Sequence, residues 1–210
     1  MRLRFKKWAP ELLSKHTDIV KSLADLPDIF EADELEIGFG LGEFIIEKAL
    51  KYPDKKFLGV EVNYTACASA LKKLLEREEK ENKKINNILL VHAPFEAIVD
   101  RIKDNSLDCI YLNFNDPWIK KRQHKRRLTY PSKLEIYYRK LKDNGLILYK
   151  SDNDAYYFDS KTYFAIKADL FDAQFIDDYA FDVNSDVMSE YERKFRSLNQ
   201  PIHRIIGRKK

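Results

Sequence analysis

Short apolar runs alternate with longer amphipathic stretches along most of the 210 residues. This alternation constrains the fold more than any other feature, because it is typical of strand–helix repeats that build a mostly parallel sheet. The predicted strands are Glu34–Ile37, Phe57–Val62, Ile88–His92, Cys109–Asn113, Leu146–Lys150, Gln174–Val183 and Ile202–Arg208. The predicted helices are Glu43–Lys51, Thr65–Glu81, Phe95–Ile102, Pro131–Leu141 and Lys161–Phe171, with a short helical segment near Glu190. The pattern predicts one α/β domain over residues 1–210, with a seven-stranded sheet, helices on both faces, and a basic arm over 1–30 whose mobility the sequence leaves open.

The composition excludes several classes of protein. Hydrophobic residues make up 44% and charged residues 34% of the chain, a balance that favours a globular domain over a disordered one. No run approaches the roughly 20 apolar residues that span a bilayer, so we expect no membrane contact. Cys67 and Cys109 match no metal-ligand spacing, and we expect reduced core thiols in a cytoplasmic protein without a bound metal.

A glycine turn follows the first predicted strand and opens a helix. Its glycines are Gly38, Gly40 and Gly42, a tighter spacing than the G-x-G-x-x-G that receives a pyrophosphate in dinucleotide-binding folds. This spacing suits a ligand without phosphates that passes close over the backbone, where a Cβ atom would block the approach. Glu61, at the end of the second strand, can accept hydrogen bonds from both ribose hydroxyls of an adenosine. Glu36 can face a cationic sulfonium, so the segment predicts S-adenosylmethionine rather than NAD.

A carboxylate and a dense basic segment come directly after the fourth predicted strand. Asp116 is held in a turn by Pro117 and Trp118, and six Lys or Arg residues follow within positions 120–127. The formal charge of the whole chain is +4, so the residues outside those six sum to 4 − 6 = −2. The basic charge is therefore local, and a single-sign cluster of this kind favours contact with RNA or DNA phosphates. Trp118 either stacks on a base or packs the loop.

The Asn-Asp-Pro-Trp sequence is similar to the motifs of enzymes that methylate exocyclic amines, but it lacks their second proline. An exocyclic amine must lose a proton on methylation. Guanine N7 already has a lone pair, so it needs only alignment and a stabilising carboxylate. The residues alone leave two alternatives open: an amine methyltransferase acting on nucleic acid, and a non-catalytic RNA-binding protein with a degenerate methyltransferase fold.

Several stretches together carry a family resemblance. The segment NFNDPWIKKRQHKRRL resembles the signature of the bacterial tRNA (guanine-N7-)-methyltransferases, and LEIGFGLGEF, GVEVN, KSDN and SEYERKF are similar to further motifs of that family. The resemblance implies a Rossmann-like class I fold that uses S-adenosylmethionine. It also implies methyl transfer to N7 of guanine-46, in the variable loop of tRNA. The sequence does not distinguish a monomer from a homodimer.

The resemblance assigns roles to residues, beside those that the glycine turn suggests. Asp116 is the expected catalytic residue. The expected cofactor-binding residues are Glu36, Gly38, Gly40, Gly42, Glu61, Pro94 and Asp116. The expected substrate-binding residues are Lys120, Asp152, Ser189, Glu190, Tyr191 and Glu192. The residues expected to face RNA are Arg122, Gln123, His124, Lys125, Arg126 and Arg127.

Three positions depart from the family pattern. Ile119 stands where a second proline is usual, and Ser189 replaces a threonine but keeps the hydroxyl. Pro94 stands where the family commonly has an aspartate on the adenine side of the cofactor, which leaves adenine to backbone groups, Phe95 or Glu96. Ser189 also opens an S-x-x-E sequence, which predicts a capping box at the start of a helix.

Overall fold

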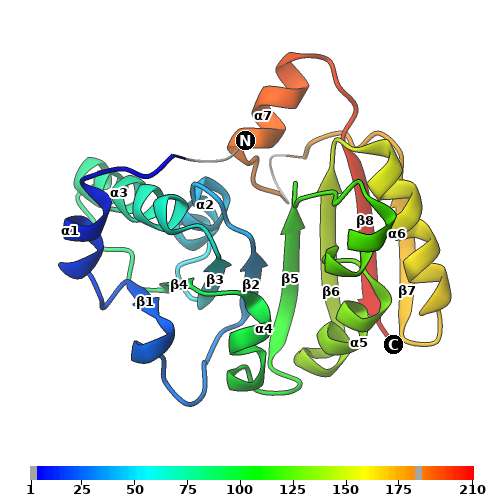
Figure 1. Cartoon of the computed structure of the whole chain (residues 1–210), viewed down its shortest axis with the longest axis horizontal. Helices are drawn as coiled ribbons and strands as arrows, with labels where there is room; N and C mark the ends of the chain where they lie inside the picture. The colour runs from blue at the N-terminus through cyan, green and yellow to red at the C-terminus, as the bar shows by residue number, and fades with distance from the viewer. Residues whose placement is uncertain (1–3, 183–185) are drawn as a thin grey trace. The chain divides into compact units, whose positions relative to one another are not determined.

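The computed structural model describes residues 4–182 and 186–210, which form two compact units, Met1–Lys103 and Asp104–Lys210. Each unit contains four of the described strands (Figure 1). The first unit comprises α1 (Ala9–Ser14), β1 (Val20–Ser22), η1 (Leu23–Asp25), β2 (Glu34–Ile37), α2 (Glu43–Lys51), β3 (Phe57–Glu61), α3 (Tyr64–Glu81), β4 (Ile88–His92), α4 (Phe95–Ile98) and η2 (Val99–Arg101). The second unit comprises β5 (Leu107–Asn113), η3 (Lys121–Arg126), α5 (Pro131–Lys140), β6 (Leu141–Ser151), α6 (Asp154–Ile166), β7 (Phe171–Ile176), α7 (Glu190–Ser197) and β8 (His203–Lys209).

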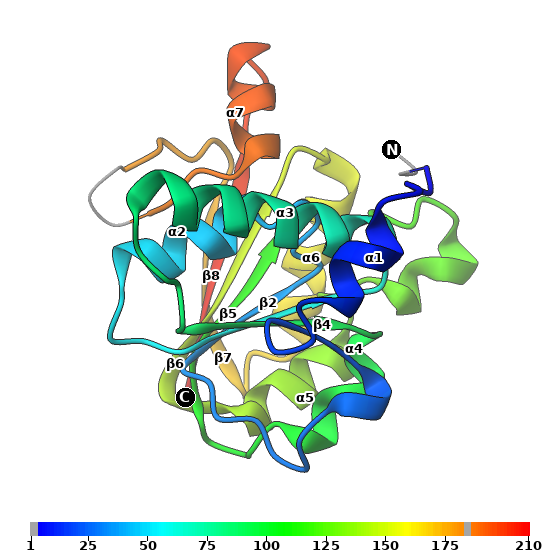
Figure 2. The same cartoon turned by 90° about the vertical axis from the view of Figure 1, so that its left-hand side faces the viewer.

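In the first unit the strands lie in the order β1-β4-β3-β2, and every neighbouring pair is parallel. All four residues of β2 are buried, as expected for a parallel strand that is covered on both faces. Helices α2 and α3 lie on one face of this sheet and α4 lies on the other (Figure 2). The short helix α1 packs against α3, and its residue Ala9 is fully buried.

In the second unit the strands lie in the order β5-β6-β8-β7. β5 and β6 are parallel, whereas β8 runs antiparallel to both of its neighbours. Helices α5 and α6 pack against each other and cover one face of this sheet (Figure 1). Helix α7 lies at the end of the sheet where β5 and β6 terminate (Figure 1). The residues that follow these two strands therefore reach the same edge as α7.

Local sequence signals set where several helices begin. Pro131 occupies the first turn of α5, where a missing N–H leaves no helical hydrogen bond unmade. The side chains of Asn63, Asn153 and Ser189 each accept a hydrogen bond from the backbone N–H three residues later, and they cap α3, α6 and α7. The Ser189 half of the predicted capping box is thus confirmed, whereas the Glu192 carboxylate binds Lys150 and Arg196 instead of reaching back to Ser189. Caps of this kind typically stabilise a helix by about 1 kcal/mol.

The predicted α/β architecture with a mostly parallel sheet is confirmed, and β2, β4 and α2 match their predicted bounds. The predicted count of seven strands is wrong, because the described residues contain eight. The missed strand β1 is only three residues long, too short for an alternating pattern to stand out. The helix expected at Lys161–Phe171 is α6, which begins earlier, at Asp154, directly after its cap residue Asn153. The strand expected at Gln174–Val183 is β7, which ends at Ile176; Val183 lies outside the described residues.

The two cysteines are buried and free, as predicted. Burial raises the pKa of the Cys67 thiol, and the nearby Glu61 carboxylate raises it further. A thiol with a raised pKa stays protonated at neutral pH and is a poor nucleophile. Cys67 and Cys109 therefore serve as small apolar core residues.

Candidate active site

The glycine turn of the first unit joins the end of β2 to the start of α2. Gly38, Gly40 and Gly42 have φ values of 79°, 55° and 77°, in the left-handed region that favours glycine. A Cβ atom at Gly42 would lie 2.5 Å from the Cβ atom of Ala70, so this position tolerates no side chain. A Cβ atom at Gly40 would meet nothing within 4 Å. The backbone of Gly40 thus borders open space. Open space is what a ligand needs to pass close over this turn.

The carboxylate of Glu61 is fixed against this turn. One oxygen accepts a hydrogen bond from the Gly40 N–H at 3.0 Å, and the other accepts from the Asn63 N–H at 2.8 Å. The structure therefore brings together the glycine turn and the acid that the sequence pairs with it. Each carboxylate oxygen has a second lone pair, which leaves acceptor capacity for the hydroxyl groups of a ligand. This chemistry fits the ribose of an adenosine cofactor.

The other cofactor candidates of the first unit lie in contrasting environments. Glu36 is 3% exposed and belongs to β2. Pro94 is exposed and immediately precedes α4, whereas the Phe95 side chain is 3% exposed and belongs to the core. Val62, which follows Glu61, is an apolar side chain that is 65% exposed. No sequence pattern singles out Val62, because its exposure depends on where β3 ends.

In the second unit, β5 ends at Asn113 and the chain enters the turn that contains Asp116. The Asp116 side chain is exposed. Phe114 and Trp118, which flank this turn, have φ values of 50° and 43°. Positive φ is rare for bulky residues and is retained only where the surrounding structure fixes it. The Phe114 N–H donates to the Lys150 carbonyl at 2.9 Å, which ties the turn to β6.

Arg127 contacts the turn from the far end of the basic segment. Its side chain is 2% exposed, and its Nε donates to the Pro117 carbonyl at 2.6 Å. Its guanidinium also forms an ion pair with Asp159 and lies 5.0 Å from the centre of the Tyr156 ring. The charge of Arg127 is therefore engaged within the protein. We expect it to support the turn rather than to contact RNA.

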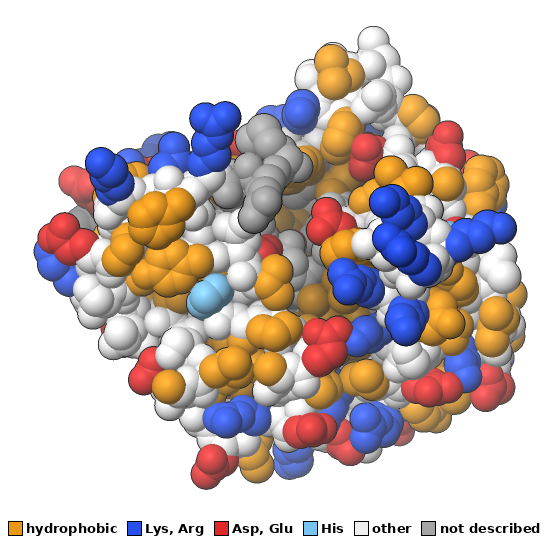
Figure 3. All heavy atoms as spheres, viewed as in Figure 1, with side chains coloured by type: hydrophobic (Ala, Val, Ile, Leu, Met, Phe, Trp, Pro, Cys, Tyr) orange, Lys and Arg blue, Asp and Glu red, His pale blue; other side chains and the backbone are white. Residues whose placement is uncertain are grey.

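The rest of the basic segment is oriented differently. Gln123 and His124 are half-buried, and the exposed members of the segment are Lys120, Lys121, Arg122, Lys125 and Arg126. Lys and Arg side chains gather over this part of the second unit in the space-filling view (Figure 3). The Arg126 guanidinium lies 5.1 Å from the centre of the Trp118 ring, so Trp118 contacts the cluster as well as the turn. The surface has the charge and the accessibility that phosphate contact requires.

The late substrate candidates divide into exposed and buried residues. Asp152, Glu190 and Tyr191 are exposed, and Ser189 is half-buried. Glu192 is fully buried. The exposed residues lie after β6 or on the first turn of α7, at the same edge of the sheet.

Aromatic rings connect α7 to the turn after β5. The rings of Phe114 and Tyr191 are 6.3 Å apart between their centres, with 21° between their planes. Phe195 lies 5.8 Å from Phe114 and also neighbours Tyr191. The three rings form one aromatic cluster that the sequence motifs did not predict.

Five charged residues form what we call the α7 ion cluster: Lys150, Asp186, Glu192, Arg196 and Arg204. Burial by itself would raise the pKa of the Asp186 carboxyl, but the Lys150 ammonium and Arg204 hold that pKa below its ordinary value. Burial raises the pKa of the Tyr179 hydroxyl, and the Asp186 carboxylate, to which it donates, raises it further. The surroundings of Asp186 therefore favour its ionised form.

Comparisons with known proteins show the family to which this chain belongs. The family model described as "Putative methyltransferase" matches residues 31–205. The tRNA (guanine-N(7)-)-methyltransferase of Pediococcus pentosaceus is 35% identical, with 98% of each chain covered. That of Mesoplasma florum is 35% identical over 100% of this chain and 99% of its own length. The chain belongs to the tRNA (guanine-N(7)-)-methyltransferase family.

Solved structures with low sequence identity show the same fold. An antibiotic-related methyltransferase superposes with a TM-score of 0.56 at 13% identity, covering 100% of this chain and 96% of its own. The tRNA (m1A58) methyltransferase TrmI from Aquifex aeolicus gives a TM-score of 0.55 at 13% identity, covering 100% and 71%. The predicted class I methyltransferase fold is therefore confirmed.

Among residues 4–182 and 186–210, no helix is both long and apolar enough to cross a membrane. Within the same residues, no group of three or more His, Cys, Asp or Glu side chains is arranged to bind a metal ion.

The sequence motifs assign no role to Lys150 or Arg204, because the partners of both side chains are distant in sequence. Lys150 contacts residues of the segments around 186 and 192, and Arg204 reaches back to Asp186. One signal was visible, since Lys150 is a lone cation at the end of an apolar strand. A buried lysine needs a carboxylate partner, but nothing in the sequence specifies which one.

Proposed function

We propose that the chain transfers the methyl group of S-adenosylmethionine to N7 of guanine-46 in the variable loop of tRNA. Family membership over almost the whole chain supports this activity. The observation that carries the assignment of the chemistry is the exposed Asp116 carboxylate in the turn that ends β5, followed at once by an exposed basic surface. A base and a phosphate backbone can be engaged there by adjacent residues.

The first unit has the groups that this cofactor needs. S-adenosylmethionine, when bound, supplies an electrophilic methyl group on a positively charged sulfur. Gly38, Gly40 and Gly42 offer a close approach to the backbone, and Glu61 offers acceptor oxygens to the ribose hydroxyls. Glu36, a buried acid of β2, is proposed to face the sulfonium. On the adenine side, Pro94 has no N–H, so it offers adenine its carbonyl oxygen and the apolar surface of its ring.

Asp116 is the proposed catalytic residue, and its work is alignment rather than proton transfer. Guanine N7 attacks with its own lone pair, so no base is needed to remove a proton. A carboxylate beside the guanine can accept hydrogen bonds from the Watson–Crick edge and can stabilise the positive charge that develops on the ring. Asp152 is proposed to contribute a second acceptor, because it follows β6 at the same edge.

The proposed tRNA contacts come from two places, the basic segment 120–127 and the first turn of α7. The exposed basic residues of the segment 120–127 bind phosphates, which positions the RNA without reading its sequence. Lys120 lies closest in sequence to Asp116 and is proposed to contact the target nucleotide. Ser189, Glu190 and Tyr191 are proposed to contact the substrate from the first turn of α7. We further propose that residues 1–210 act as one catalytic domain in the cytoplasm, as a monomer or homodimer.

The test is incubation of the chain with S-adenosylmethionine labelled in the methyl group and unmodified tRNA, followed by nucleoside analysis. We expect label in N7-methylguanosine, and we expect none with a transcript in which guanine-46 is replaced by adenine. Label on an exocyclic amine would favour the amine methyltransferase instead. The non-catalytic alternative predicts no transfer and no saturable heat when S-adenosylmethionine is titrated into the chain.

A further inference from the structure

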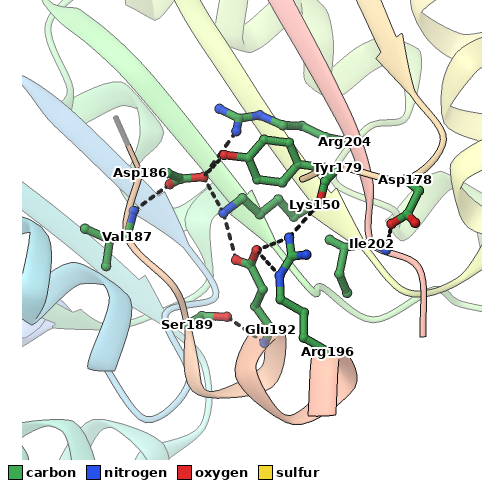
Figure 4. A network of polar contacts seen from close by, with 10 residues as sticks. All are labelled: Lys150, Asp178, Tyr179, Asp186, Val187, Ser189, Glu192, Arg196, Ile202 and Arg204. Atoms are coloured by element: carbon green, nitrogen blue, oxygen red, sulfur yellow. Dashed lines mark hydrogen bonds and ion pairs between the residues drawn. The ribbon is translucent and has the colours of Figure 1, made fainter. Parts of the chain in front are cut away.

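The α7 ion cluster centres on the ammonium of Lys150 (Figure 4). Lys150 lies near the end of β6 and is 3% exposed. Its Nζ is 2.6 Å from Oδ2 of Asp186 and 2.8 Å from Oε2 of Glu192. Both carboxylates are buried, at 8% and 0% exposure. One cation thus bridges a carboxylate of α7 and a carboxylate of the segment that precedes this helix.

Two arginines complete the cluster (Figure 4). Arg196 of α7 donates from Nε and Nη2 to Oε1 of Glu192, at 3.0 Å and 2.7 Å. Arg204 of β8 donates from Nη1 to Oδ2 of Asp186 at 3.1 Å. Three cations and two carboxylates give a formal charge of 3 − 2 = +1. Removal of either carboxylate therefore raises the formal charge of this buried site from +1 to +2, which is unfavourable.

These contacts bear on the role of Glu192, which the family resemblance assigns to substrate binding. Both of its carboxylate oxygens bind cations of the protein, and its side chain has no exposed surface. A move of the carboxylate toward a substrate would leave Arg196 without its carboxylate partner and Lys150 with only one of its two, Asp186. Its neighbours Glu190 and Tyr191 are exposed on the same helical turn. Glu192 is thus oriented inward while its neighbours face outward.

We infer that Glu192 is a positioning residue, which together with Lys150 and Asp186 fixes the first turn of α7 at the end of β6. Helix α7 has eight residues, and an isolated helix of that length is not stable in water. Its place must therefore come from tertiary contacts, and the ion cluster supplies buried ones. The functional consequence rests on the proposed function: a fixed α7 presents Ser189, Glu190 and Tyr191 to the tRNA.

Removal of the central ammonium separates this inference from a substrate-binding role. In Lys150→Met, Asp186 and Glu192 lose the cation that bridges them, and each keeps only its own arginine. The facing carboxylates then repel each other across an uncharged side chain, which loosens the attachment of α7 to β6. In the double variant Lys150→Met/Glu192→Gln one of the two charges is gone, and Arg196 can still donate to the amide oxygen. A positioning role predicts that the second substitution restores activity. A substrate-binding role predicts a further loss.

The experiment measures kcat and KM for tRNA, and hydrogen exchange of the amides of residues 190–197 without substrate, on the full chain. We expect Lys150→Met to raise KM by about 10-fold or more and to accelerate exchange in α7, while kcat changes less. We expect the double variant to have a KM at least about threefold below that of Lys150→Met, with slower exchange.

Lys142→Met is the matched control. Lys142 lies on the same strand, and its Nζ is 2.7 Å from Oδ1 of Asp108, but both side chains are well exposed. An exposed ion pair contributes little, so we expect KM and α7 exchange to stay at wild-type values. The single variant Glu192→Gln keeps an oxygen for Lys150 and Arg196, and we expect a KM increase of about two- to fivefold with kcat retained.

A double variant less active than Lys150→Met, or unchanged α7 exchange in Lys150→Met, overturns the inference. Exchange is measured without substrate, so a failure of the proposed methylation leaves this result readable. Methylation of N7 with unaltered exchange overturns the inference alone. If Lys150→Met does not fold, Glu192→Gln decides: accelerated α7 exchange with kcat retained supports positioning, and lost kcat with a protected α7 refutes it.

Discussion

The glycine turn of the first unit and helix α7 of the second unit are both candidate ligand-binding segments, but they are fixed by different means. In the first unit, backbone conformation and backbone N–H groups do the work: three glycines adopt positive φ, and two N–H groups bind the Glu61 carboxylate. In the second unit, buried side-chain charges from β6, β8 and the segment before α7 fix the helix. The first arrangement joins residues 21 positions apart at the ends of consecutive strands, whereas the second joins residues 42 positions apart.

This difference has consequences for substitution. A site that rests on backbone groups keeps its shape when most side chains change, but it fails at the few glycines that no other residue can replace. A site that rests on a charge cluster changes as a unit, because each member is the counter-charge of another. Single substitutions in the two units should therefore produce different patterns of loss.

Asp116→Ala should produce the largest loss of activity without a loss of stability. Asp116 is exposed, so its removal should lower methylation by about 10²–10³-fold while the melting temperature and tRNA binding stay close to wild type. Asp169→Ala, at another exposed acid of the second unit, is the control and should retain activity. Normal turnover by the Asp116 variant would contradict its catalytic assignment.

Paired glycine substitutions sharpen the statement about the first unit. In Gly42→Ala the Cβ atom would meet Ala70 at 2.5 Å with φ at 77°, so strain and overlap together should cost about 2–5 kcal/mol. Gly40→Ala meets nothing within 4 Å, so only the strain of about 1–2 kcal/mol applies. By calorimetry, the melting temperature of Gly42→Ala should be lower than that of Gly40→Ala. Titration with S-adenosylmethionine should show a loss of affinity in the folded Gly40→Ala variant.

Equal melting temperatures for the two glycine variants would contradict the packing argument at Gly42. Unchanged cofactor affinity in Gly40→Ala would show that the ligand does not pass over this part of the turn.

The smallest expected effects distinguish the exposed Arg126 from the buried Arg127 within the basic segment. Arg127→Gln removes a buried guanidinium from Pro117 and should destabilise the chain by about 1–3 kcal/mol. Arg126→Gln changes an exposed side chain, so stability should change by less than about 1 kcal/mol. For tRNA binding, Arg126→Gln should reduce the slope of log K against log salt by about one. If Arg127→Gln altered the salt slope and left stability intact, Arg127 would contact phosphate and would not support the turn.

Much of the fold follows from local patterns. The predicted bounds of β2, β4 and α2 match the structure, because each is a strong apolar or amphipathic run with clear ends. The start of α6 was predicted too late, since the cap at Asn153 was outweighed by the apolar pattern further along. Strand β1 was missed because three residues carry too little pattern, and its partner β4 lies far along the chain.

The same division applies to the candidate site. The pairing of the glycine turn with Glu61 could be predicted, because consecutive parallel strands end at one edge of a sheet. The burial of Arg127 could not be predicted, because its neighbours in the basic run are exposed and share its chemistry. The aromatic contact between Phe114 and Tyr191 joins residues far apart in sequence, and no local pattern specifies it.

The sequence by itself determined the α/β class, the glycine turn, the acid at the end of β3 and the charge of the segment after β5. Each of these depends on residue type and short spacing, which the chain carries locally. Only the tertiary structure decided which charges are exposed and which are buried, and therefore that Glu192 binds Lys150 while Glu190 faces outward. The physical reason is that burial depends on the packing of distant elements, whereas residue type does not.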